Sequence, residues 1–85
     1  MVVYRIRKPD DAKKLISYLT KEGYTIAAKG TENLDDMETP FDISLSTAAF
    51  YLIKDDREIL ILTAGTTDEI KNTFGCLPRQ SIVPL

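Results

Sequence analysis

The residues that most suggest chemistry lie in the stretch ILILTAGTTDEIKNTFG, at positions 59–75. An apolar strand, a turn with a glycine and the start of a helix follow one another here. This order is common in phosphate-binding proteins, because free backbone N–H groups at a helix N-terminus attract an anion. However, Gly65 stands alone and no lysine follows it, so neither G-x-x-x-x-G-K-[ST] nor G-x-G-x-x-G is present.

The same turn fits a capping box, S/T-x-x-E, at Thr66 and Glu69. In this motif the threonine hydroxyl accepts a hydrogen bond from the N–H of Glu69, and the Glu69 carboxylate accepts one from the N–H of Thr66. Neither N–H group is then available to an anion. The negative charges of Asp68 and Glu69 also oppose the helix dipole that would attract it. We therefore predict a helix start, with a phosphate site as the less favoured alternative.

The sequence contains no histidine and a single cysteine, Cys76. Without histidine, the usual zinc sites, the Ser/His and Cys/His pairs and the commonest general base are excluded. Cys76 has no base or cation beside it in the sequence, so we expect a small hydrophobic side chain and not a reactive thiol. We expect no catalytic residues, no metal ion and no cofactor. An enzyme would have to use Lys29, Asp35, Asp36, Glu38 or Tyr51.

Residues 31–42, TENLDDMETPFD, form an acidic segment that apolar side chains interrupt. The segment lacks the spacing and the glycine of an EF-hand loop, which argues against a calcium or magnesium site. Its apolar residues either anchor the loop to the body of the domain or contact another protein. The candidate partner-binding residues are Leu34, Asp35, Asp36, Met37, Glu38 and Phe41.

Residues 1–30 carry seven Lys and Arg residues against three acids. Such a region suits nucleic-acid phosphates, with nearby tyrosines available for stacking. The chain as a whole is acidic, with a net charge of −2 and a pI near 5.0, whereas a dedicated nucleic-acid-binding domain is usually basic. Nucleic acid is therefore not the expected partner. The candidate basic patch consists of Arg5, Arg7, Lys8, Lys13 and Lys14.

These residues must be positioned by a chain of 85 residues, 44% hydrophobic and 28% charged, which predicts one domain over residues 1–85 with a thin core. No apolar run reaches the roughly 18–20 residues that cross a bilayer, so no membrane association is expected. The first residues lack the order of a signal peptide, and we expect a cytoplasmic protein.

The N-terminal third predicts a strand, a helix and a second strand. Residues 2–7 alternate between apolar and basic side chains, as in a strand with one dry face. Apolar residues at helical spacing follow and predict a helix, with Asp10 as its N-cap. We expect Gly23 to end this helix in a left-handed backbone conformation. Residues 24–29 alternate again, and a right-handed crossover would make the two strands parallel.

The rest of the chain predicts a loop, a hairpin, a helix and a last strand. We expect Gly30 to open the loop and Asn33 to cap one turn within it. Residues 42–53 alternate at first and become wholly apolar from Ala48 to Ile53, as in a buried central strand, although Ala48 to Ile53 alone would also suit a helix. KDDR then forms a tight turn to a returning strand. After the second helix, SIVPL at 81–85 predicts an edge strand, because Pro84 has no N–H.

The predicted fold is an α+β two-layer sandwich, β-α-β-β-β-α-β, with two helices on one face of a mixed four- or five-stranded sheet. This is a variant of the ferredoxin-like plan, which hosts many unrelated functions. We predict a small non-enzymatic regulatory or accessory domain that binds another protein and can form a homodimer through residues 81–85. The alternatives are a small-ligand sensor with a pocket near Gly65 and Gly30, or weak nucleic-acid binding through the basic N-terminal third.

Overall fold

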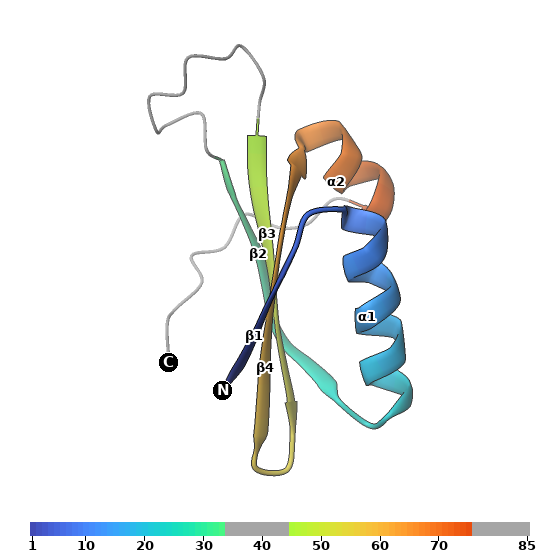
Figure 1. Cartoon of the computed structure of the whole chain (residues 1–85), viewed down its shortest axis with the longest axis vertical. Coiled ribbons are helices and arrows are strands. Elements are labelled where there is room, and N and C mark those ends of the chain that lie inside the picture. The colour runs from blue at the N-terminus through green and yellow to red at the C-terminus, as the bar shows by residue number, and fades with distance from the viewer. Residues whose placement is uncertain (34–44, 76–85) are drawn as a thin grey trace.

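A computed structural model of the chain describes residues 1–33 and 45–75 (Figure 1). Both helices lie on the same face of one mixed sheet, which confirms the predicted α+β sandwich for these residues. The strand predicted at 81–85 lies outside them. The elements in chain order are β1 (Val2–Ile6), α1 (Pro9–Lys21), β2 (Thr25–Asn33), β3 (Leu45–Lys54), β4 (Arg57–Thr66) and α2 (Thr67–Phe74).

The four strands are arranged in the order β1-β4-β3-β2. Strands β2, β3 and β4 form an antiparallel meander, and β1 pairs with β4 in parallel. Strands β1 and β2 therefore run in the same direction, as expected, but lie at opposite edges of the sheet. Successive strands of a meander stay adjacent, so only the outer sides of β2 and β4 are left for β1, which takes the one beside β4. The resemblance to the ferredoxin-like plan is only partial.

The core lies between the two helices and the central strands β3 and β4. In the antiparallel register Phe50 faces Ile61 and Leu52 faces Ile59, so these side chains share the helix-covered face of the sheet. Phe74 of α2 packs on Phe50, with ring centroids 4.7 Å apart. The remaining buried members of the cluster are Ala12, Ile16, Leu19, Ala48 and Ile70.

Helix α1 begins two residues earlier than the sequence predicts. Lys8 occupies the N-cap position, and Pro9 is the first helical residue, where its missing N–H costs nothing. The prediction of Asp10 as N-cap is therefore wrong. Asp10 lies in the first turn, and its carboxylate accepts a hydrogen bond of 3.4 Å from the Thr73 hydroxyl of α2. It joins the two helices.

Helix α1 ends as predicted, with Gly23 in a left-handed conformation at φ 101°. The N–H of Gly23 donates to the Thr20 carbonyl and the N–H of Tyr24 to the Leu19 carbonyl, at 3.1 and 3.0 Å, as in a Schellman motif. Lys54 of β3 also donates to the Glu22 carbonyl. The end of the helix is thereby attached to the β3–β4 hairpin.

The prediction that Gly30 opens a loop is wrong. Strand β2 continues to Asn33, which pairs with Ser46, whereas the turn predicted after Asn33 lies outside the described residues. Gly30 itself pairs with Ala49 in the middle of the ladder. The long β3 strand offers pairing groups beyond Gly30, and these hydrogen bonds outweigh the local preference of glycine for a turn.

Candidate functional site

Strand β1 forms one edge of the sheet, and its apolar side chains are exposed. The side chains of Met1, Val2, Val3 and Tyr4 are 61, 52, 48 and 42% exposed. Within the described part of the chain β1 pairs only with β4, so the backbone groups on its outer side have no strand partner there. Exposed apolar residues along an unpaired strand edge are a template for a further strand.

The side chains of β1 divide between the two faces of the sheet. Val2 and Tyr4 are in register with Ile59 and Ile61 of β4, whose side chains belong to the helix-covered core. Val3 and Arg5 alternate with them and project from the other, open face. A strand added to β1 would therefore contact side chains on both faces.

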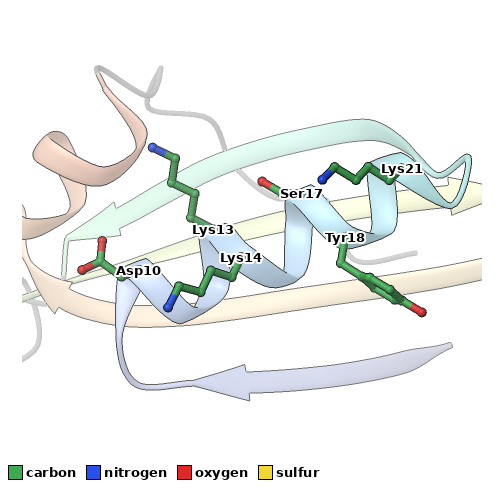
Figure 2. A pocket seen from close by; sticks show the side chains of 6 residues that line it. All are labelled: Asp10, Lys13, Lys14, Ser17, Tyr18 and Lys21. Carbon is green, nitrogen blue, oxygen red and sulfur yellow. The ribbon is translucent and has the colours of Figure 1, made fainter.

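Helix α1 flanks this edge on the helix-covered face (Figure 2). In this view Lys14 and Tyr18 project from the side of the helix that lies toward β1, whereas Lys13 and Ser17 project the other way. Lys14 and Tyr18 are four residues apart, which places them on one side of the helix. Tyr18 is 60% exposed, so an aromatic ring and a cation lie open beside the exposed strand.

A shallow hollow lies on the open face next to the end of β1. Arg5 and Arg7 line it, together with Leu62 and Ala64 of β4 and Thr47 of β3. Its volume of about 380 Å³ is at the low end of the range for ligand pockets, roughly 300–1,000 Å³. Because the hollow is open, it suits one or two side chains of a peptide better than an enclosed metabolite.

The candidate basic patch is divided by the β1 edge. Arg5 and Arg7 line the hollow on the open face, and Lys13 and Lys14 lie on the outer surface of α1 (Figure 2). Lys8 borders a separate crevice between the start of α1 and α2. The sequence shows the positive charge but not this division, which follows from the place of β1 in the sheet.

The start of α2 is poorly suited to an anion. The N–H of Glu69 donates to the Thr66 hydroxyl at 3.2 Å, which confirms the predicted cap. Among the hydrogen bonds of the described residues the reciprocal one of a capping box is not found. The Glu69 carboxylate lies instead against Gly65, where an added Cβ would be 3.0 Å from Oε2 and 3.2 Å from the Pro9 Cγ. A carboxylate and a proline ring thus occupy the space before the helix.

The two glycines proposed to border a ligand pocket are not neighbours. Gly65 pairs with Ser46 and Gly30 with Ala49, on opposite sides of β3. None of the described pockets has both glycines in its lining.

The chain matches no protein-family model, no curated protein and no solved structure. The function must therefore be inferred from the geometry of the described residues.

Several features singled out in the sequence lie outside the described residues, Cys76 among them. Within residues 1–33 and 45–75, no three Asp, Glu or Cys side chains are grouped as metal ligands. In the same ranges neither helix has the length and apolar character of a membrane span. The candidate partner-binding residues Leu34, Asp35, Asp36, Met37, Glu38 and Phe41 also lie outside the described ranges.

The β1 edge was not predicted from the sequence. The predicted free edge was at residues 81–85, and residues 2–7 were predicted only as a strand with one apolar and one basic face. The available signal was the run Met1, Val2, Val3 and Tyr4, in which three apolar residues precede the aromatic without a polar interruption. A strand buried on one face only should alternate from its first residue.

Proposed function

We propose that this domain is a protein-interaction module that binds a partner segment in extended conformation along β1. The observation that supports it is the exposure of residues 1–4, 42–61%, on a strand whose outer edge is unpaired in the described chain. In this mode of recognition, main-chain hydrogen bonds supply affinity and contacts with alternate side chains supply specificity. The α1 flank with Tyr18 and the hollow at Arg5 provide such contacts on the two faces.

The opposite edge of the sheet is less suited to pairing. Strand β2 has an irregularity between Ile26 and Ala28, and Lys29 follows it. Bulges and lysines are devices that protect sheet edges against pairing with another chain. The first charged residue of β1 is Arg5, so its first three residues carry no such protection. The contrast favours β1 as the binding edge.

The proposal is tested by selecting peptides from a random display library against the full chain, followed by amide hydrogen exchange on the complex. Binding along β1 should slow exchange at residues 2–6. Replacing Tyr4 with Ser should weaken the selected peptides about tenfold, the effect of losing a contact worth about 1.4 kcal/mol. Protection of another element, or equal binding by the Tyr4→Ser variant, would refute the proposal.

The chain offers a matched control for Tyr4. Ile26 lies on the other edge strand, in register with the core residue Leu52, as Tyr4 is with Ile61. The two side chains are almost equally exposed, 41% for Ile26 and 42% for Tyr4. The Ile26→Ser variant should therefore change folding stability by a similar amount and leave peptide affinity unchanged. Equal losses of affinity in the two variants would mean that the effect comes from folding and not from contact.

A further inference from the structure

Cations lie on both sides of the β1 edge, and in the described chain they are without acidic partners. Arg5 and Arg7 line the hollow on the open face. Lys14 lies beside Tyr18 on the α1 flank (Figure 2). No ion pair joins any of the three to another described residue. A partner strand seated on β1 would therefore meet positive charge on each of its faces.

Arg5 lies on β1 and Arg7 directly follows its last residue, Ile6, and both line the same hollow. Each residue of an added strand advances about 3.3 Å, so carboxylates at alternate positions come within reach of these two long side chains. Guanidinium groups bind carboxylates in bidentate pairs. Leu62 and Ala64 give the same hollow an apolar floor, which accommodates the aliphatic part of a glutamate side chain.

On the basis of the proposed function, we infer that the partner of β1 is an acidic extended peptide. Two of its carboxylates, at alternate positions, contact Arg5 and Arg7, and apolar side chains on the other face of the peptide contact Tyr4 and Tyr18. Charge complementarity of this kind fixes the register of a partner and excludes basic competitors.

Two other occupants fit the surface less well. A second copy paired antiparallel through β1 would bring two sets of Arg5, Arg7 and Lys8 beside one seam, and like charges across a pairing are destabilising. A nucleic acid would satisfy the cations through its phosphates, but it offers no strand backbone to the β1 edge and no apolar contact for Val2 and Val3.

The inference is tested with three synthetic peptides that share an apolar pattern and carry Glu, Gln or Lys at two alternate positions. Binding to the full chain is measured by fluorescence anisotropy at low and high salt. The Glu peptide should bind at least tenfold tighter than the Gln peptide, with the difference shrinking as salt screens the charges. The Lys peptide should bind most weakly.

Exposed residues provide the variants for this test. The double variant Arg5→Gln, Arg7→Gln should remove the preference for Glu over Gln, whereas Lys29→Gln, on the opposite edge strand, should preserve it. If the Glu and Gln peptides bind equally and both lose affinity in Tyr4→Ser, the acidic partner is excluded while binding along β1 stands. If none of the peptides binds, the inference fails.

Two further measurements distinguish the remaining occupants. Light scattering over a range of concentrations should show a monomer. If it shows a dimer that the Tyr4→Ser substitution dissociates, the partner of β1 is a second copy of the chain and the inference is overturned. A single-stranded RNA oligonucleotide should bind more weakly than the Glu peptide. Tighter binding by the RNA would overturn the inference.

Discussion

Replacing Thr63 with Val should stabilise the domain, because its hydroxyl is buried without a hydrogen-bond partner among the described residues. Thr63 is 1% exposed, and its Oγ1 has no hydrogen-bond partner within residues 1–33 and 45–75. It lies on β4 between Ile6 of β1 and Ala48 of β3, on the face that the helices cover. Valine keeps the β-branched shape and replaces the hydroxyl with a methyl group, which needs no partner.

The expected size follows from the cost of desolvating one hydroxyl. Burying such a group without a compensating hydrogen bond costs about 1–3 kcal/mol. The free energy of unfolding of Thr63→Val should rise by this amount. In a domain of this size each kcal/mol corresponds to about 4–8 °C in the midpoint of thermal unfolding, so the shift should be easy to measure.

Urea unfolding followed by circular dichroism provides the assay. The midpoint should move to higher urea while the slope of the transition stays the same, since the surface exposed on unfolding hardly changes. Thr47→Val is the control, because Thr47 lies on the neighbouring strand, is only partly buried and should change stability by less than about 0.5 kcal/mol. An unchanged or lower stability of Thr63→Val would show that the hydroxyl is hydrogen-bonded and refute the reasoning.

Three further predictions concern the second helix and the open face. Thr66→Ala removes the side-chain cap of α2 and should lower the free energy of unfolding by about 1 kcal/mol in the same urea assay. An unchanged urea midpoint would show that this hydrogen bond does not stabilise the helix. Gly65→Ala places a Cβ 3.2 Å from the Pro9 ring and should cost about 1–3 kcal/mol, so a thermal midpoint equal to that of the wild type would contradict this packing. Desolvation, followed by the hydrogen bond and the charge of Glu58, raises the pKa of Tyr51 above 10.0. The protonated phenol therefore contributes stability that is complete below that ordinary value and is lost as the pH rises through the raised pKa. Absorbance titration should show a tyrosine that ionises above pH 10.0, and Glu58→Gln should lower its pKa; a titration that Glu58→Gln leaves unchanged would contradict the assignment.

The sequence determined the features that depend on neighbouring residues. Hydrophobic periodicity located the first helix, Gly23 ended it with a φ of 101°, and the cap at Thr66 located the start of the second. The tight turn between β3 and β4 was also predicted. Each of these features is set by the preferences and hydrogen bonds of a few successive residues, which the local sequence specifies almost completely.

Only the tertiary structure decided which strands became edges and, with them, the candidate site. Gly30 pairs within β2 because β3 extends alongside it, and β1 lies at an edge because the β2–β3–β4 meander fills the other positions. That placement leaves Val3 exposed and divides Arg5 from Lys14 across the β1 edge. Strand order is a competition between distant segments for the same backbone hydrogen bonds, and the alternation of side chains is the same whichever segment wins.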